Sequence, residues 1–274
     1  MKADLHMHSV YSDGTKEVKE LIQRAKLKGL DMIALTDHDS VEGVEEAIKY
    51  GSEVGIKVIP GLELSTYHNN ESVHILGYFP HGIPQKVLDF SQYQLKHRRE
   101  RAITMMERLE NLHGLKIKKE KVLSMKGMIT RAHMIGAIVE SNPEYDRKQA
   151  FDLFLNDNAP AYIPSTKMST TDGVKFLKEC NAIVVLAHPV LLKHNDVHEL
   201  MQLPIDGIEA IYPKNRGNDE AFFRTVASHN NLFVTAGSDY HGLIDFAHED
   251  MAYNVLEGKD LDVFLERIGL NENN

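Results

Sequence analysis

The chain has 274 residues, of which 42% are hydrophobic, and its formal net charge at pH 7 is −9. A chain of this size buries one large core, or a core beside a small inserted domain, and it contains no apolar run of about 18 residues that would cross a bilayer. The acidic balance disfavours proteins that hold long nucleic acid on a broad basic surface, although it is compatible with a locally positive pocket.

The start of the chain and its cysteine content bear on location. The first strand-like pattern begins within a few residues of Met1, which leaves no room for a signal peptide. Cys180 is the only cysteine, so no disulfide can form within the chain. We therefore expect a cytoplasmic protein with no membrane partner. The sequence does not predict the oligomeric state.

Helical and extended patterns alternate over the first 80 residues. Two predicted helices carry apolar faces, which consist of Val18, Leu21, Ile22 and Ala25, and of Val44, Ala47 and Ile48. The first helix is expected to stop near Gly29. The apolar runs at residues 32–35 and 57–59 follow the two helices and predict buried strands.

Residues 81–163 break this alternation, because they hold long helix-compatible stretches and no convincing buried strand. The clearest helix is predicted over residues 87–113, with Ile103, Met106 and Leu109 available for packing. The alternating strands and helices on either side of this segment are typical of a parallel α/β barrel. We interpret the segment as a helical insertion beside the mouth of that barrel. Its basic run, residues 98–101, is typical of a solvated helix face, and the functional alternative is contact with a phosphorylated substrate.

The alternation resumes after residue 165. Val174 and Leu177 mark a helix, and the run at residues 183–186 predicts a strand. Further strands are expected at residues 208–211 and 232–235, with a helix at about 219–229 between them. A series of strands and helices with functional residues after the strands is how a parallel α/β barrel builds its active site.

Histidines and carboxylates sit in short apolar-flanked motifs along the chain, and each motif falls where a strand is predicted to end. These candidate metal ligands are His6, His8, Asp13, His38, Glu63, His74, His188, Asp239 and His241. Side chains two positions apart on a strand leave the same face about 6–7 Å apart, so His6 and His8 can reach one cation. Imidazole and carboxylate without thiolate suit Zn, Mn or Fe. We therefore predict a polynuclear metal site.

The motifs resemble the PHP (polymerase and histidinol phosphatase) superfamily of metal-dependent phosphoesterases. They occur in family order as Asp-Leu-His-x-His-Ser-x-x-Ser-Asp-Gly, Thr-Asp-His-Asp, Gly-x-Glu, Val-His-Ile-Leu-Gly-Tyr, Ala-His-Pro and Gly-Ser-Asp-x-His. The insertion and its motif at residues 130–133 resemble the branch that hydrolyses nucleoside 3′,5′-bisphosphates or trims short RNA from the 5′ end. The resemblance implies a distorted (β/α)7 barrel formed by residues 1–80 and 164–274, with residues 81–163 as a helical insertion domain.

The resemblance also implies up to three divalent metal ions. The first would be held by His6, His8, Glu63 and Asp239, the second by Glu63, His74 and His188, and the third by Asp13, His38 and His241. A water ionised between metal ions would act as the nucleophile, so no protein nucleophile is expected. Three such ions carry more charge than the three carboxylates, which leaves positive charge for a phosphate.

Arg131 is the candidate phosphate clamp, because a guanidinium offers a planar, charged fork that matches phosphate oxygens. His133 is expected to donate to the same phosphate or to the leaving oxygen, with helix packing as the alternative. The resemblance implies a histidine shortly after residue 209, where this chain has Lys214 and Asn215, so Lys214 or Asn215 is the candidate substrate contact there. Asp37 is expected to orient the neighbouring His38.

Three functions compete on this sequence. The first is a phosphatase acting on nucleoside 3′,5′-bisphosphates or short 5′-phosphorylated oligonucleotides, supported by the insertion and the Arg131 motif. The second is a small-metabolite phosphatase of the histidinol-phosphate or sugar-phosphate kind. The third is a non-catalytic PHP module, which predicts degraded ligands, whereas the ligand set here is intact. The expected partner is a small phosphorylated nucleotide or a short oligonucleotide, and no long nucleic acid.

Overall fold

The structure, a computed structural model, describes residues 1–165, 168–242 and 250–270. The chain begins with β1 (Lys2–Asp4), α1 (Val18–Leu27), β2 (Met32–Leu35), α2 (Val44–Val54), β3 (Lys57–His68) and β4 (Glu71–Tyr78). It continues with α3 (Gln85–His113), α4 (Lys119–Leu123), α5 (Arg131–Ser141), α6 (Arg147–Ala150) and a π-helical turn (Phe151–Leu155). The remaining elements are β5 (Met168–Ser169), α7 (Thr170–Glu179), β6 (Ile183–Leu186), a 3₁₀ turn (Pro189–Leu191), α8 (Val197–Leu200), β7 (Gly207–Ile211), α9 (Asp219–His229), β8 (Phe233–Ala236), β9 (Leu256–Glu257) and α10 (Gly258–Arg267).

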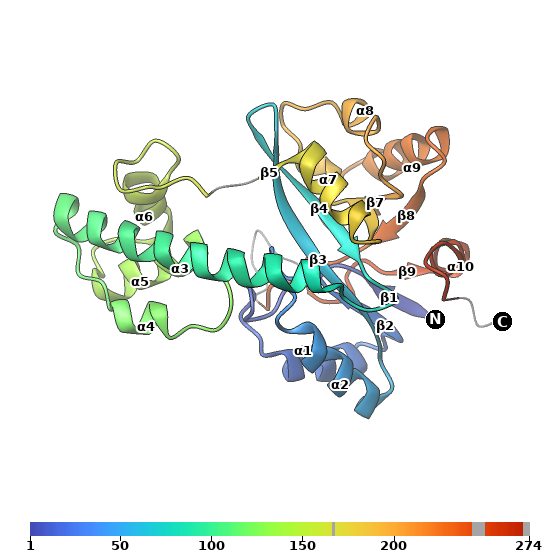
Figure 1. Ribbon diagram of the computed structural model, residues 1–274, viewed down its shortest axis with the longest axis horizontal. Helices are drawn as coiled ribbons and strands as arrows, with labels where there is room; N and C mark the ends of the chain where they lie inside the picture. Colours follow the sequence, from blue (N-terminus) through green and yellow to red (C-terminus); the bar gives the residue numbers. More distant parts are fainter. Residues whose placement is uncertain (166–167, 243–249, 271–274) are drawn as a thin grey trace.

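One sheet runs through the molecule in the strand order β8-β7-β6-β4-β3-β2-β1-β9, with β5 paired to β3 at its side. Its β8 and β1 regions meet just beyond the strands, where Leu5 N donates to Ala236 O at 3.0 Å and Met7 forms a parallel bridge with Tyr240. The sheet is therefore a nearly closed barrel with helices outside it (Figure 1). This confirms the predicted α/β fold, a distorted (β/α)7 barrel.

Most predicted barrel elements lie where the sequence pattern places them. The face of α1 is buried through Val18, Leu21, Ile22 and Ala25. On α2 the prediction holds for Val44 and Ala47 but is wrong for Ile48, whose side chain is 44% exposed. Strands β2 and β6 and helix α9 coincide with their predictions, whereas β7 begins one residue earlier and both ends of β8 lie one residue later. Within the described part of the chain, no helix is both long and apolar enough to cross a membrane.

Strand β3 differs from the prediction and moves two candidate ligands into mid-strand. The sequence suggested a strand at residues 57–59 that ends before Glu63, with His74 also near a strand end. Instead β3 continues through Pro60 and pairs antiparallel with β4 along its whole outer half. The continuation is possible because the carbonyl of Pro60 still accepts a backbone hydrogen bond. Both residues of the turn at 69–70 have positive φ, as a tight hairpin requires.

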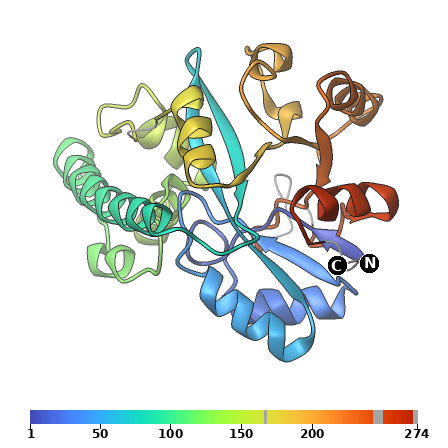
Figure 2. The ribbon, with the colours of Figure 1, turned by 45° about the vertical axis from the view of Figure 1, so that its right-hand side comes forward.

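The segment between β4 and β5 is helical and contains no strand from residue 81 to 163, all of which the structure describes. It lies to one side of the barrel (Figure 2). It has a hydrophobic cluster of its own that includes Met106, Leu109 and Ile138, whereas Val87 at the start of α3 packs in a barrel cluster. Since α3 contributes to both clusters, the predicted boundaries of the helical insertion domain stay a prediction.

Gly237, directly after β8, is required by close packing beneath the predicted site. A Cβ at this position would lie 2.2 Å from His6 Cβ and 2.6 Å from Glu209 Oε1. Gly237→Ala should therefore lower the free energy of unfolding by about 2–3 kcal/mol through overpacking. Gly136 on α5 is the control, because its added Cβ meets nothing closer than 3.7 Å, and Gly136→Ala should stabilise by about 0.5–1 kcal/mol. Urea midpoints of the two variants check this, and equal midpoints would contradict it.

Candidate metal centre and substrate cavity

The nine predicted ligands gather at one end of the barrel. They come from the segment after β1 (His6, His8 and Asp13), from the segment after β2 (His38), from β3 and β4 (Glu63 and His74), and from the segments after β6 and β8 (His188, Asp239 and His241). Apart from His188, their side-chain nitrogen and oxygen atoms form three overlapping groups, and within each group these atoms lie within 4.8 Å of one another. Spacing alone suggested that His6 and His8 reach one cation, and the barrel brings the other ligands to this pair.

The first group joins His6, His8, Glu63 and Asp239, the set that the family resemblance implies for the first metal ion. His8 Nε2 lies 3.1 Å from Asp239 Oδ1 and 3.3 Å from Glu63 Oε2. The Nε2 atoms of His6 and His8 face each other at 3.2 Å. Two imidazole nitrogens and two carboxylates that converge on one point are typical of a metal site.

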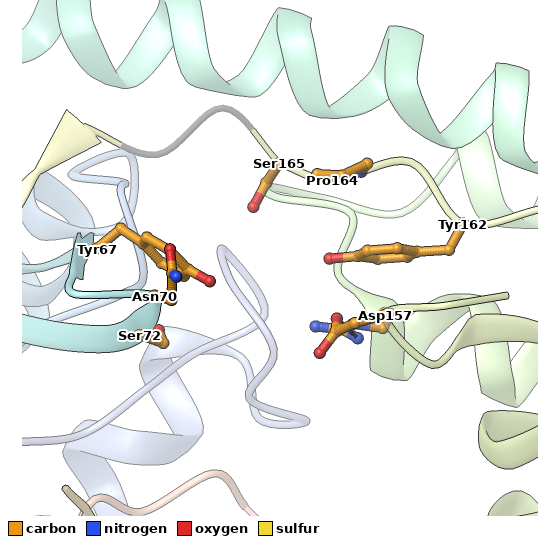
Figure 3. A pocket seen from close by; sticks show the side chains of 8 residues that line it. Tyr67, Asn70, Ser72, Asp157, Tyr162, Pro164 and Ser165 are labelled. Atoms are coloured by element: carbon orange, nitrogen blue, oxygen red, sulfur yellow. Dashed lines mark hydrogen bonds and ion pairs between the residues drawn. The ribbon is translucent and has the colours of Figure 1, made fainter. Parts of the chain in front are cut away.

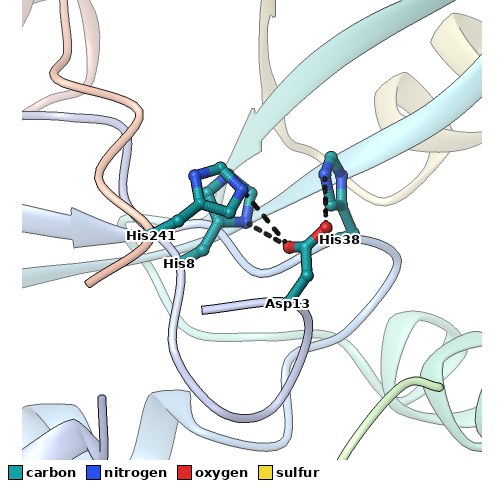
Figure 4. A group of neighbouring side chains, drawn as sticks. All are labelled: His8, Asp13, His38 and His241. Atoms are coloured by element: carbon teal, nitrogen blue, oxygen red, sulfur yellow. Dashed lines mark ion pairs between the residues drawn. The ribbon is translucent and has the colours of Figure 1, made fainter. Parts of the chain in front are cut away.

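The second group is centred on Asp13 and contains His8, His38 and His241 (Figure 4). The carboxylate of Asp13 points toward the three imidazoles, with His241 Nε2 at 3.3 Å from Oδ1 and His38 Nε2 at 3.8 Å from Oδ2. The group therefore contains the three residues expected for the third ion, with His8 in addition.

The third group places His38, Glu63 and His74 together. Glu63 is fully buried and lies between the groups: its Oε1 is 2.9 Å from both His74 Nδ1 and His188 Nε2, and its Oε2 is 2.9 Å from His38 Nδ1. These contacts bring His188 to the cluster as well. A carboxylate contacted on both oxygens in this way has the position of the bridging ligand expected from the sequence.

Three of the imidazoles are oriented by a partner on Nδ1, which leaves Nε2 for the cluster. His6 Nδ1 contacts Glu209 Oε1 at 3.0 Å, His8 Nδ1 contacts Ser12 Oγ at 3.3 Å, and His241 Nδ1 donates to the Asp239 carbonyl at 2.7 Å. Imidazoles that bind metal ions usually donate their other N–H in this manner. The backbone also fits a functional site, since Asp239 has a φ of 52°, which a residue with a side chain rarely adopts.

The histidines of the cluster favour the charged form of its carboxylates. Burial acts to raise the pKa of Glu63, but the imidazoles of His38, His74 and His6 outweigh it and hold that pKa well below its ordinary value. The pKa of Asp13 is likewise lowered by surrounding histidines despite burial. Glu63 Oε2, His38 Nδ1 and Asp13 Oδ1 are buried without a hydrogen-bond partner although they lie at ion-pair distances. Nitrogen and oxygen atoms that converge without hydrogen bonds between them are suited to bind divalent cations.

Two residues of this centre were missed at the sequence level. Glu209, fully buried on β7, contacts His6 Nδ1 and accepts from His188 N at 2.7 Å. The hydroxyl of Tyr212 donates to Asp239 Oδ2 at 2.8 Å. The signal for Glu209 was present in the sequence, because a carboxylate within an otherwise apolar strand is expected to have a buried partner.

Asp37 does not orient His38, contrary to the prediction. Its carboxylate accepts from the Ser9 backbone N–H at 2.7 Å, the Ser9 hydroxyl at 2.7 Å and the Ser12 hydroxyl at 2.6 Å. Through Ser12 it supports His8 instead. The reason is topological, since the segment after β1 lies beside the end of β2 and offers three donors to this carboxylate.

Glu209→Gln should weaken metal binding roughly 10- to 100-fold, which is the usual cost of losing a partner of a metal-bound imidazole. The amide is similar in shape, so the fold should be retained, but it lacks the charge that holds the Nδ1 proton of His6. Calorimetric titration with Mn measures the effect. Unchanged Mn affinity would show that Glu209 only fills space, and Glu220→Gln on the exposed side of α9 is the control.

A cavity of about 200 Å³ opens over the cluster and is lined by Asp13, Ser65, Thr130, Ser165, the cluster histidines His38 and His74, the arginines Arg98, Arg101 and Arg131, and Tyr162. The basic run of α3 is therefore not a uniform solvated face. Arg98 pairs with Asp39, and Arg99 donates to the carbonyls of Leu123 and Met125. Part of the run, Arg98 and Arg101, thus lines the cavity, and its contact with a phosphorylated substrate stays a prediction.

Arg131 also lines a second cavity of about 530 Å³, whose lining residues Tyr162 and Ser165 are shared with the first. In Figure 3, Tyr67 and Tyr162 lie on opposite sides of this cavity with their hydroxyl groups turned toward each other. Arg131 Nη1 donates to Asp157 Oδ1 at 2.8 Å and to the Leu155 carbonyl at 3.2 Å. The candidate clamp is therefore at the junction of the two cavities.

His133 and Asn215 take other positions. His133 Nδ1 accepts from the Thr130 backbone N–H at 3.2 Å at the start of α5, and its ring lines a further cavity of about 540 Å³ that Asp13 and His241 also line. Burial lowers the pKa of His133. The amide of Asn215 donates to the Ala210 carbonyl at 2.7 Å, and Asn215 is not among the residues that line the cavities over the cluster. The structure places His133 on a cavity that two cluster residues also line, and it gives Asn215 a backbone contact.

This chain is similar to known proteins over most of its length. A family model described as PHP domain matches residues 4–254. The 5′-3′ exoribonuclease of Haemophilus influenzae is 28% identical over 249 residues, which cover 88% of this chain and 90% of the relative. The phosphoribosyl 1,2-cyclic phosphate 1,2-diphosphodiesterase of Eggerthella lenta is 27% identical and covers 88% and 95%. The 3′,5′-nucleoside bisphosphate phosphatase of Chromobacterium violaceum is 28% identical and covers 87% and 86%.

A solved structure has the same fold. It is that of a protein from Bifidobacterium adolescentis assigned as a metal-dependent phosphoesterase, which superposes with a TM-score of 0.82 at 26% identity. The match covers 97% of this chain and 96% of that one, so it includes the helical segment as well as the barrel.

Proposed function

Because this chain is a metal-dependent phosphoesterase of the PHP domain family, we propose that its substrate is a nucleoside 3′,5′-bisphosphate, hydrolysed to a 5′-mononucleotide and phosphate. The observation that carries the proposal is an arginine-lined cavity opening directly over three overlapping ligand groups. Relatives over most of this chain include a bisphosphate phosphatase and exoribonucleases, whose names refer to nucleotides. Short 5′-phosphorylated oligonucleotides are a related substrate in the same proposal.

The nine ligands are proposed to hold up to three divalent ions, with Mn, Fe or Zn as candidates. His6, His8, Glu63 and Asp239 would hold one, Glu63, His74 and His188 another, and Asp13, His38 and His241 the third. When bound, such ions neutralise charge on phosphate oxygens and lower the pKa of water toward neutrality. Glu63 keeps the ion positions together, and Glu209 and Ser12 hold the imidazoles that face them.

Arg131 is proposed to bind phosphate, because it lines the cavity beside the cluster and offers charged N–H donors to it. His133 lines the cavity of about 540 Å³ that Asp13 also lines, and it is proposed to contact a leaving group there. Burial favours its neutral form, in which one ring nitrogen accepts from the Thr130 N–H and the other carries the proton. Asn215 has no part in this proposal.

A substrate with two phosphates is expected to react faster than one with a single phosphate. One phosphate is bound at the cluster, and binding energy from the second positions the reacting group. For the Mn-loaded protein, kcat/KM for adenosine 3′,5′-bisphosphate should exceed that for adenosine 3′-monophosphate by roughly 10- to 100-fold, on the scale of one charge-assisted contact. Phosphate-release assays measure both. Equal values would remove the case for a second phosphate site.

The substrate class itself is tested by a wider screen that adds mononucleotides, short 5′-phosphorylated RNA, histidinol phosphate and sugar phosphates. A preference for histidinol phosphate or a sugar phosphate would move the assignment to a small-metabolite phosphatase. A phosphoribosyl cyclic phosphate belongs in the same panel, because one relative that covers 88% of this chain is a diphosphodiesterase for that compound. Absence of hydrolysis throughout the panel would favour a non-catalytic module.

A further inference from the structure

Two arginines of the cavity share one aromatic ring. The guanidinium carbon of Arg131 lies 4.6 Å from the centroid of the Tyr162 ring, and that of Arg101 lies 5.4 Å from the same centroid. Both distances are within the range of cation–π attraction. The two arginines come from different helices, α3 and α5, so this ring fixes the position of one guanidinium relative to the other.

The charges of the three cavity arginines are balanced unequally. Arg98 pairs with Asp39, and Arg131 pairs with Asp157. Arg101 has no carboxylate partner among the described residues, and its Nε donates to the Ile163 carbonyl at 2.6 Å. Burial lowers the pKa of Arg101, and the charges of Arg98 and Arg131 lower it further. The cavity therefore contains a partly buried cation whose charge calls for an anion.

The ion pair of Arg131 is one that an entering anion can replace. The Asp157 side chain is 75% exposed, whereas that of Arg131 is 33% exposed. An exposed pair of this kind contributes little to stability, so a phosphate dianion can compete with Asp157 for the guanidinium. Arg131 can then turn its charge into the cavity that it shares with Arg101.

We propose that Arg101 and Arg131, aligned by Tyr162, form an anion site that binds the phosphate of the substrate that is not hydrolysed. This inference rests on the proposed function, and it names Arg101 as a further residue that determines specificity. The cavity of about 200 Å³ is lined by cluster residues and by these arginines together, which suits a molecule with two anionic groups. The reacting phosphate is bound at the cluster, and the second one meets the guanidinium pair.

The first test compares two substrates in the Mn-loaded protein. Arg101→Ala should reduce kcat/KM for adenosine 3′,5′-bisphosphate by roughly 10- to 100-fold, while kcat/KM for adenosine 3′-monophosphate changes less than about twofold. Lys96→Ala is the control, because it removes one charge from an exposed position of the same helix. Equal losses on both substrates, or no loss on either, would overturn the inference.

The second test measures binding without turnover, which separates this site from the proposed reaction. Adenosine 5′-monophosphate retains the second phosphate, so its affinity by calorimetry should fall in Arg101→Ala, whereas adenosine, which has no phosphate, should bind equally to both proteins. One outcome is that the wild-type protein hydrolyses the bisphosphate while Arg101→Ala binds the 5′-monophosphate as tightly as the wild-type protein does. In that case the proposed function stands and this site is refuted. If hydrolysis fails but binding depends on Arg101, the site stands alone.

Tyr162 is a positioning residue in this proposal, and conservative replacement tests that role. Tyr162→Leu removes the ring and should weaken 5′-monophosphate binding about as much as Arg101→Ala does. Tyr162→Phe keeps the ring and should restore binding to near the wild-type value. Comparable unfolding midpoints for the two variants establish that both are folded. Equal binding by the leucine and phenylalanine variants would show that the ring does not align the arginines.

Discussion

Replacing Glu63 with glutamine is expected to abolish turnover, with a loss of at least about 1000-fold, or about 4 kcal/mol, in kcat/KM. Glu63 contacts His38, His74 and His188 and belongs to two of the three ligand groups. The amide removes the negative charge that would hold two ions in place. His6→Ala should have a comparable effect, because it removes one nitrogen ligand from the first group.

The metal content of the variants tests whether the loss of turnover results from a loss of bound ions. Elemental analysis should show fewer ions per chain in Glu63→Gln and His6→Ala than in the wild-type protein. Chelation should inactivate the wild-type protein, and added Mn should restore it. Glu199→Gln, at an exposed side chain, is the matched control and should keep both metal and activity. Full activity in protein shown to be metal-free would be fatal to this prediction.

Arg131→Ala is expected to reduce kcat/KM by roughly 10- to 1000-fold without changing the metal content. The side chain lines both cavities but is absent from the three ligand groups, so its loss should remove phosphate binding and leave the ions in place. Arg131→Lys should recover only part of the activity, because an ammonium group cannot reproduce the bidentate fork of a guanidinium. Steady-state kinetics with the bisphosphate and elemental analysis check the two parts.

Arg108→Ala serves as the control for Arg131, since it removes an arginine from an exposed position of the helical segment. Unaltered kinetics in both Arg131 variants would show that Arg131 has only a structural role, which is to donate to Asp157 and to the Leu155 carbonyl. A loss of metal along with activity would instead show that Arg131 supports the ligand cluster. The two failures are therefore distinguishable by the same measurements.

The sequence by itself determined most of the predicted barrel elements and the family. Apolar faces at helical spacing predict α1, because burial of one face is a local consequence of the helix period. The apolar runs of β2 and β6 predict strands by a local pattern too, because a strand that is buried on both faces is apolar throughout. Motif order pointed to the PHP family, which the match over residues 4–254 shows.

Only the tertiary structure decided which of these residues meet. Glu63 was placed near a strand end by local pattern, but the partner strand β4 extends β3 past it and sets its contacts with His74 and His188. Glu209 and Tyr212 joined the centre because β7 and β8 bring them beside His6 and Asp239. Contacts between residues far apart in sequence leave no periodic signal, so no local pattern could predict them.

Tertiary packing also decided which partners the arginines of α3 have. Arg98, Arg99 and Arg101 belong to one charged run, and their spacing does not distinguish a cavity residue from a solvated one. The rotation of α3 gives each arginine a different partner. Arg98 pairs with the Asp39 carboxylate, Arg99 donates to two carbonyls, and Arg101 meets a ring and a carbonyl. Chemistry that depends on helix rotation and on distant partners is decided by packing, whereas the residue types needed for that chemistry were already present in the sequence.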